Sequence, residues 1–372
     1  MTDVSDLIDV GEEPVDPPTS ALEKKYSEQM RQIVTQKIDL PISTLPEMIK
    51  EQINLNPDFQ RRDRWDQDKQ SRFLESIIMN VPIPPVFLGE DQYGTYVVLD
   101  GRQRLTAVNE FLKNTFKLKG LEVWSDLNGK GFNDLQKQKL DRAITRRFIP
   151  AVVILRESSP QVKYDVFDRL NTGGVIAEPM EIRNAVFQGA FNKLIRSLSA
   201  LPTFRRLWNI PTDQIELEKN ALFRKMSDIE LVLRYFALSH FDQMDMKYKD
   251  YLSDYLEGRN KEYLTNPNLE QQDRDDFTRA IENCWTVFGN DAFRKDPQAK
   301  KSAPLADAVM IALAGHDPGK VSQNAGAIRN AITNLLNNNE SFRKAFGTGT
   351  NGKSAIRTRI ELAQAAVSAV VH

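Results

Sequence analysis

Residues 97–106, VVLDGRQRLT, hold the side chains best suited to chemistry in this chain. An apolar run ends at Asp100, Gly101 follows, and a helical pattern begins at once. Gly101 permits a sharp turn and the close approach of a ligand. The first amides of a helix attract anions, and arginines in the first turn add forked donors that suit phosphate oxygens. We therefore expect an anion site at this turn.

Two side chains of the turn suit phosphoryl chemistry directly. Asp100 can hold Mg²⁺ or accept a proton, and Gln103 can orient a water molecule. The alternative is structural: Asp100 caps the helix and the arginines are solvated, because strand–turn–helix junctions are common. This segment alone leaves both interpretations open.

Two further segments combine charge with turn residues. Residues 56–65, NPDFQRRDRW, place three arginines and two acids between a proline and a tryptophan. Residues 166–174, VFDRLNTGG, end a helical pattern with residues that either cap the helix or present amides to a phosphate as a backbone nest. Surface charge and a plain helix end are the structural alternatives.

The elements that must position these residues form an α+β arrangement. A strand and a helix are expected over 35–52, a helix over 68–80, and a β-hairpin from the apolar runs PPVFLGE and TYVVLD. A strand KLKG, a helix near 134–145 and a strand over 148–155 complete this region.

Strand patterns fade after residue 160 and helical periodicity takes over. Helices are expected over 160–170, 179–189, 214–240, 269–288, 303–314, 324–338 and 354–370. We therefore predict a disordered acidic tail over 1–22, an α+β domain over 23–175 and an all-α helical domain over 176–372.

The composition excludes several classes of protein. The 372 residues carry 50 basic and 51 acidic side chains, with a mean hydropathy of −0.46, which argues against a histone-like polycation and a membrane bundle. Residues 1–22 hold six acids and no base, so the remainder has 50 bases, 45 acids and a net charge of +5. Cys284 is the only cysteine, which excludes an internal disulfide and a cysteine-based zinc site. The N-terminus lacks a signal-peptide pattern, so a cytoplasmic location is expected.

Residues 347–354, GTGTNGKS, match the phosphate-loop pattern G-x-x-x-x-G-K-[ST]. That loop functions after a buried strand and before a helix, whereas a polar helical sequence precedes it here. We interpret it as a turn between helices, with a phosphate contact by Lys353 at the start of the last helix as the weaker alternative.

Taken together, these segments resemble the N-terminal domain family of GmrSD-type restriction systems, a ParB-like family related to the ParB and sulfiredoxin fold. The matching pieces are PDFQRRDRW, SRFLESIIMNVPIPPVFL, DGRQRLTAV and FDRLNTGG. FRKMSDIELVLRYFA and FRKAFGTGTNGKSAIRTRIE extend the resemblance over most of residues 30–365.

The resemblance implies NTP binding and hydrolysis at the DGRQR segment, often in defence against phage with modified DNA. The usual signature reads Asp-Gly-Gln-Gln-Arg, and Arg102 here adds a cation and removes a neutral amide. Full-length relatives often carry a C-terminal nuclease domain of the His-Asn-His type. The histidines His240, His316 and His372 are far apart, so we expect that domain to be absent and DNA cutting to need a partner.

The first functional hypothesis is therefore a Mg²⁺-dependent, NTP-binding and NTP-hydrolysing regulatory protein, with the base unassigned. The predicted catalytic residues are Asp100, Gln103 and Arg104. The residues predicted to bind the nucleotide are Gly101, Arg102, Thr106, Gln60, Arg61, Asn171, Thr172 and Gly173. The predicted Mg²⁺ ligands are Asp100 and Asp58.

Two alternatives remain open. One is a non-catalytic DNA-binding or sensing module, consistent with the +5 charge and with Arg142, Arg146 and Arg147. The other is a ParB-like phosphotransferase with NTP as the donor, which would release a phosphorylated acceptor instead of free phosphate. The partners considered are a nucleotide, DNA, a separate nuclease or effector subunit and a second copy of the chain, but no membrane.

Overall fold

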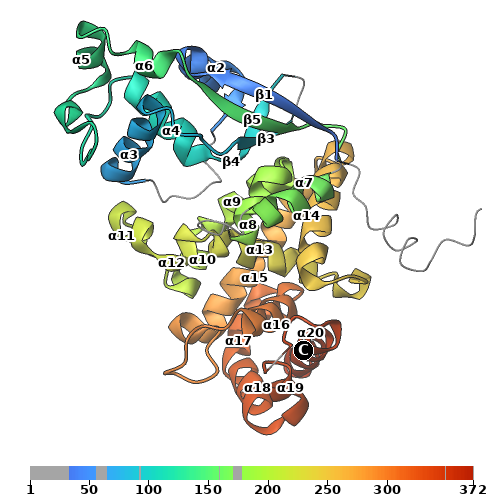
Figure 1. Cartoon of the computed structure of the whole chain (residues 1–372). Coiled ribbons are helices and arrows are strands. Elements are labelled where there is room, and N and C mark those ends of the chain that lie inside the picture. The colour runs from blue at the N-terminus through green and yellow to red at the C-terminus, as the bar shows by residue number, and fades with distance from the viewer. Residues whose placement is uncertain are drawn as a thin grey trace, which may run out of the picture.

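The computed structural model describes residues 33–55, 65–91, 94–158, 160–170, 178–347 and 349–371. Within them, a mixed α/β region is followed by an all-helical region (Figure 1), which confirms the predicted α+β and all-α fold class. The tail over 1–22 and the predicted boundary at residue 175 lie outside the described residues.

The α/β region is built on a five-stranded mixed sheet with the order β1-β5-β3-β4-β2. The strands are β1 (Thr35–Pro41), β2 (Ile53–Asn54), β3 (Val86–Glu90), β4 (Tyr96–Asp100) and β5 (Phe148–Ile154). Strands β3 and β4 pair antiparallel, which confirms the predicted hairpin, and β2 joins β4 in parallel at the sheet edge. The predicted strand KLKG is wrong. Leu118 there exchanges backbone hydrogen bonds with the loop around Gly129 and Lys130 instead of joining the sheet.

Helices cover one face of the sheet. They are α2 (Leu45–Glu51), α3 (Gln67–Ile78), α4 (Arg102–Leu112), α5 (Phe132–Lys137) and α6 (Arg142–Thr145), with short 3-10 turns at Ile42–Thr44 and Ser125–Leu127. Asp66 caps α3 by accepting the Lys69 N–H at 2.8 Å. The single helix expected near 134–145 is two helices, because Lys139 between them has a φ of +57°.

Strand β4 contributes to two hydrophobic cores. Val98 packs with the apolar faces of α3 and α4 in one core, which includes Leu74 and Leu105. Val97 and Leu99 point to the opposite face and pack in a second core with the helices that follow. The end of β4 therefore lies where the α/β region meets the helical region.

Helices α7 (Pro160–Leu170) and α8 (Pro179–Val186) form this junction. Both contact β4 and lie between the sheet and the remaining helices (Figure 1). Tyr164, Phe167 and Met180 supply the apolar contacts of these helices to the second core. The segment between α7 and α8, residues 171–177, lies outside the described residues.

The helical region packs around α13, α15 and α16. Its helices are α9 (Ala190–Ser199), α10 (Pro202–Trp208), α11 (Gln214–Lys219), α12 (Ala221–Arg224), α13 (Ser227–Leu238), α14 (Tyr248–Thr265), α15 (Leu269–Phe288), α16 (Ala303–Ala314), α17 (Pro318–Gln323), α18 (Ala325–Asn338), α19 (Glu340–Lys344) and α20 (Lys353–Ser368). Among the described residues, no helix has the combined length and apolarity that a bilayer span requires.

A buried charged triad ties three of these helices together. The Asp307 carboxylate of α16 accepts hydrogen bonds from Arg234 of α13, at 2.5 and 3.0 Å, and from Arg359 of α20 at 2.9 Å. Arg359 is fully buried and also donates to the carbonyl of Thr350, at the turn before α20. Two arginines and one carboxylate therefore fix the C-terminal helix on the core.

Candidate functional site

Gly101 is the point at which β4 becomes α4. Its φ of +93° lies in the left-handed region, and a Cβ added there would lie 2.4 Å from Cγ1 of Val86. Another residue would be strained and would also collide with β3, so this position requires glycine. Gly101 is the N-cap of α4, and α4 therefore begins without a side-chain cap.

Arg104 is directed inward, against the chain that surrounds this turn. Its Nη2 donates to Oδ2 of Asp100 at 2.8 Å and to the carbonyl of Pro85 at 3.3 Å, and its Nη1 donates to the carbonyl of Pro84. Only 14% of the Arg104 side chain is exposed, and burial lowers the pKa of its guanidinium while Asp100 opposes that shift. Arg104 therefore links the Pro84–Pro85 turn to the junction of β4 and α4.

The structural alternative for this turn is wrong for Asp100 as the cap and for Arg104 as a solvated side chain, whereas Arg102 is partly exposed. Asp100 does not cap α4, because the N-cap is Gly101, and the Asp100 carboxylate instead accepts from Arg104. Arg104 is not solvated, since it contacts two carbonyls and a carboxylate. The Asp100 side chain keeps 43% of its surface exposed, so part of its carboxylate faces solvent beside the helix start.

Gln103 connects the start of α4 to the residue that precedes α3. Its Oε1 accepts a hydrogen bond from the backbone N–H of Trp65 at 3.1 Å. Trp65 is the first described residue after segment 56–64, and its ring packs edge-on against Phe73 with the centroids 5.7 Å apart. The point at which the NPDFQRRDRW segment rejoins the fold is therefore held against the DGRQR turn.

Arg102 and Thr106 occupy a different side of α4 from the residues that it buries. They are four positions apart, which places them on one helix face, and both are partly exposed. Leu105 and Val108 are fully buried on the core side. This face is the part of α4 that can present a cation and a hydroxyl to a ligand.

Six of the predicted site residues are not among those that the structure describes. They are Asp58, Gln60, Arg61, Asn171, Thr172 and Gly173. The described residues beside them are informative, because Trp65 contacts Gln103, and α7 and α8 both contact β4. Trp65 therefore lies beside the start of α4, and α7 and α8 lie beside β4.

The predicted basic residues near residue 145 have other partners. Arg147 donates to Oδ1 of Asn80 at the end of α3, and its carbonyl accepts from the N–H of Ile42. Arg142 and Arg146 are exposed on and beside α6. Among the contacts of the described residues, none joins these three arginines to the Asp100–Arg104 turn.

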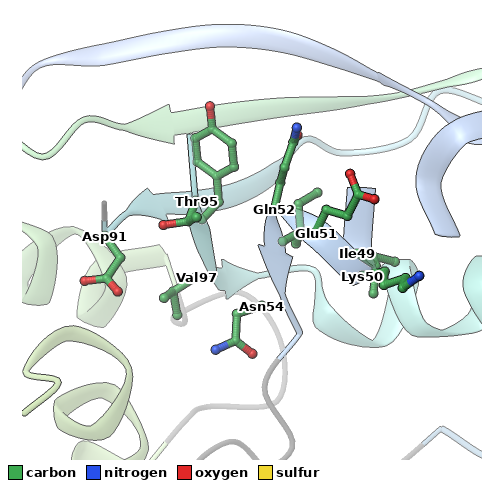
Figure 2. Close-up of a pocket in the computed structure, with 10 residues that line it drawn as sticks. Ile49, Lys50, Glu51, Gln52, Asn54, Asp91, Thr95 and Val97 are labelled. Carbon is green, nitrogen blue, oxygen red and sulfur yellow. The ribbon is translucent and has the colours of Figure 1, made fainter. Parts of the chain in front are cut away.

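A cavity that the sequence did not predict lies at the edge strand β2. Its volume is about 320 Å³, and Figure 2 shows residues of α2, β2 and the β3–β4 hairpin around it. Asn54 of β2 lies in register with Val97 of β4, and Figure 2 shows both on the same side of the strands. The remaining lining residues are Ile49, Lys50, Glu51, Gln52, Ile53, Asp91, Thr95 and Tyr96.

Along β4, Val97 is three residues from Asp100. At about 3.3 Å per residue, this end of the cavity lies about 10 Å from the turn at Gly101. A mononucleotide is long enough to bridge such a distance, so the cavity and the turn can belong to one elongated site. Gln52, Asn54 and Thr95 supply amide and hydroxyl groups of the kind that recognise a base or a ribose.

The phosphate-loop match at residues 347–354 is a turn between two helices. Helix α19 ends at Lys344 and α20 begins at Lys353, which confirms the helix–helix interpretation. The Lys353 ammonium donates to the carbonyl of Asp242 at 2.9 Å. The nearby Arg357 pairs with the Asp242 carboxylate at 3.1 Å, so this segment is attached to the helical core.

Among the described residues, no group of three His, Cys, Asp or Glu side chains is arranged to bind a metal ion. Asp100 is the one predicted Mg²⁺ ligand within them, since Asp58 lies outside. Part of the Asp100 carboxylate faces solvent, which fits Mg²⁺, because this ion usually keeps several waters and binds through one or two carboxylates and the phosphates of its substrate.

Comparisons with known proteins agree with the architecture. Residues 42–188 match the family described as GmrSD restriction endonuclease, N-terminal domain, and no C-terminal nuclease domain is detected in the chain. The match spans all the strands except β1, which lies before it, and continues through α8. A search of curated proteins and a search of solved structures each found no match.

Proposed function

Because residues 42–188 are a GmrSD restriction endonuclease N-terminal domain, we propose that this chain binds and hydrolyses nucleoside triphosphates as the regulatory component of a restriction system. The phosphates would bind at the turn between β4 and α4. DNA cleavage would be carried out by a separate nuclease or effector subunit that responds to the nucleotide state.

The geometry of Gly101 is the observation that carries this proposal. A left-handed glycine pressed against Val86 brings the uncapped start of an eleven-residue helix to the end of a buried strand. Uncapped helix starts attract anions through their amides and the helix dipole. The hydrogen bond between Asp100, at the end of β4, and Arg104, in the first turn of α4, holds this geometry in place.

We assign direct contact with the phosphates to Arg102 and Thr106. They share one face of α4 at its start, and a guanidinium there can donate two hydrogen bonds to phosphate oxygens. The part of the Asp100 carboxylate that faces solvent would hold the Mg²⁺ of the nucleotide, which would neutralise charge on the β- and γ-phosphates. Asp58 would be a second ligand from its segment.

Arg104 and Gln103 act as positioning residues in this proposal. The Arg104 guanidinium is mostly buried and donates to two backbone carbonyls and the Asp100 carboxylate, so we assign it the role of supporting the turn. Gln103 engages Trp65 through its amide oxygen and thereby holds the end of the NPDFQRRDRW segment beside the site. Catalysis would then come from positioning and charge neutralisation, as phosphoryl transfer requires.

The base of the nucleotide would bind in the cavity beside β2. Its nearer end lies about 10 Å from the phosphate turn along β4, and its volume of about 320 Å³ is within the range of small-molecule sites. The amides of Gln52 and Asn54 would supply the polar contacts to the base edge.

The test is to incubate the purified chain with each of the four NTPs and Mg²⁺, with and without DNA, and to identify the products. Release of inorganic phosphate with formation of NDP supports hydrolysis. A phosphorylated acceptor in place of free phosphate would indicate a phosphotransferase. DNA binding that is indifferent to nucleotide, with no turnover of any NTP, would contradict the proposal and favour a non-catalytic DNA-binding module.

A further inference from the structure

A second cavity lies in the helical region, outside residues 42–188. It has a volume of about 350 Å³, is open to solvent and is lined by residues of α9, α10, α12 and α13. Its lining residues are Lys193, Arg196, Ser197, Ser199, Ala200, Arg205, Phe223, Asp228 and Ile229. None of these residues belongs to the site at the end of β4.

The lining of this cavity is predominantly cationic. Lys193, Arg196 and Arg205 contribute three positive charges, and Asp228 is the one acidic residue of the lining. The side chains of Lys193 and Arg205 form no ion pair and donate no hydrogen bond within the described part of the chain. Two cations of the lining, Lys193 and Arg205, are therefore without an ion-pair partner among the described residues.

Arg205 gives a second, independent indication of a ligand. Its Nε is buried and has no hydrogen-bond partner within the part of the chain that the structure describes. A buried donor without an acceptor costs free energy comparable with a lost hydrogen bond, so such atoms usually have a partner. An anion in the cavity would supply the missing acceptor.

The cavity wall is held in a fixed shape by contacts on its outer side. Ser199 donates to the carbonyl of Arg196 at 2.9 Å, and Arg274 of α15 donates to the Ser197 hydroxyl at 3.3 Å. Two residues after Asp228, the Glu230 carboxylate pairs with the buried Arg183 of α8 at 3.1 Å. The helices that carry the cationic lining residues are therefore tied to their neighbours.

We propose that this cavity binds a small phosphorylated ligand, separate from the nucleotide site at Gly101. Phosphate oxygens are the acceptors that guanidinium groups bind best, and a dianion matches the excess of two positive charges. A volume at the lower end of small-molecule sites fits a compact phosphate ester or diphosphate. A phosphate group of single-stranded nucleic acid has the same chemistry, and the experiment separates the two sources.

The experiment is a calorimetric titration of the full chain with pyrophosphate. Two variants remove cavity cations, Lys193→Ala and Arg205→Gln, and each should weaken binding about tenfold or more, because each removes a charge-assisted contact. Lys344→Ala is the matched control, since this lysine is 74% exposed on α19. Each titration is repeated in the Arg102→Ala background, which removes the proposed phosphate contact at the other site, so that pyrophosphate bound there is not counted.

The outcomes separate this proposal from the proposed function. In the Arg102→Ala background, pyrophosphate binding that Lys193→Ala weakens about tenfold or more supports the cavity, whatever happens to NTP hydrolysis. Absence of binding at millimolar pyrophosphate, or equal affinity in the wild type and both cavity variants, would overturn it. The same titrations are run with a single-stranded oligonucleotide. If only the oligonucleotide binds, and the same variants weaken its binding, the proposal of a small phosphorylated ligand is also overturned. Lys193 is exposed, so its variant decides the matter even where Arg205→Gln fails to fold.

Discussion

Nη2 of Arg104 lies 2.8 Å from Oδ2 of Asp100, and this ion pair joins the last residue of β4 to the first turn of α4. The pair therefore connects residues on either side of Gly101, whose backbone is left-handed. Arg104 also donates to the carbonyls of Pro84 and Pro85, so one side chain attaches three pieces of backbone to each other. The turn that we propose as the phosphate site is therefore fixed before any ligand arrives, which reduces the free-energy cost of binding.

We predict that Gly101→Ala abolishes nucleotide binding and lowers stability. The left-handed φ alone costs about 1–3 kcal/mol for another residue, and the clash with Val86 adds to it. Gly94→Ala is the control, because Gly94 has a similar φ of +75° but no atom within 4 Å of an added Cβ. Thermal unfolding should show a clearly larger fall in Tm for Gly101→Ala. Equal falls for the two variants would mean that the contact with Val86 is unimportant.

We predict that Arg104→Met destabilises the domain by about 2 kcal/mol, because it removes charge-assisted hydrogen bonds to a carboxylate and two carbonyls. Arg104→Lys should recover only part of the loss, since a single ammonium cannot reproduce the planar fork. Urea unfolding measures the stability, and calorimetry measures nucleotide affinity. A variant of full stability that binds no nucleotide would show instead that Arg104 contacts the phosphates directly.

We predict that Gln103→Ala frees the Trp65 amide for hydrogen exchange, because Gln103 Oε1 is the acceptor of that N–H. Gln70→Ala is the control, since Gln70 bonds Glu110 at 2.8 Å between the same two helices without touching Trp65. Mass spectrometry of peptides that begin at least two residues before Trp65 and extend into α3 reports the exchange, because the first two positions of a peptide do not retain the label. Unchanged protection at Trp65 in Gln103→Ala would contradict the contact.

The hairpin, the end of β4 and the start of α4 could all be predicted from the sequence. Alternating and helical apolar spacing define these elements, and an Asp-Gly pair between them defines the turn. The direction of the Arg104 side chain could not be predicted, because its acceptors are backbone carbonyls of Pro84 and Pro85, twenty residues earlier in the chain. The contact between Gln103 and Trp65 is equally remote in sequence.

In the helical region, some helix boundaries and one long helix could not be predicted from the sequence. The helix expected over 214–240 is three helices, because Asn220 has an extended backbone and caps α12, and Met226 adopts a φ of +54° before α13. Neither residue is a strong breaker, so tertiary packing decides these breaks. Helix α14 was not predicted, because its apolar residues are mostly tyrosines interspersed with charges, which weakens the periodic signal.

We predict that Asp307→Asn unfolds the helical region at much lower temperature. The carboxylate lies between Arg234 and Arg359, and breaking such a buried network typically costs about 3–5 kcal/mol, because it leaves buried charges unpaired. Glu340→Gln is the control, since its pair with Lys344 is exposed and should contribute less than about 1 kcal/mol. A comparable Tm for the two variants would show that the triad of Asp307, Arg234 and Arg359 does not stabilise the helical region.

We predict that Lys301 makes the free energy of unfolding depend on pH. Partial burial lowers the pKa of Lys301 to about 8, although its ammonium donates to the carbonyls of Asn290 and Ala292. The unfolded chain holds this proton up to a pKa of about 10.5, so it binds more protons than the folded state between pH 8 and 10.5. The contribution of Lys301 to stability should therefore rise with pH across that window. A difference in stability between wild type and Lys301→Met that stays constant from pH 7 to 10.5 would contradict this.

The most direct test of the central claim is calorimetric binding of a non-hydrolysable NTP with Mg²⁺ to the wild type and to Arg102→Ala. We predict one site per chain in the wild type, and an affinity at least about tenfold lower in Arg102→Ala. Equal affinity in the two proteins, or no binding of any of the four nucleotides to the wild type, would contradict the assignment of the phosphate site to the turn between β4 and α4.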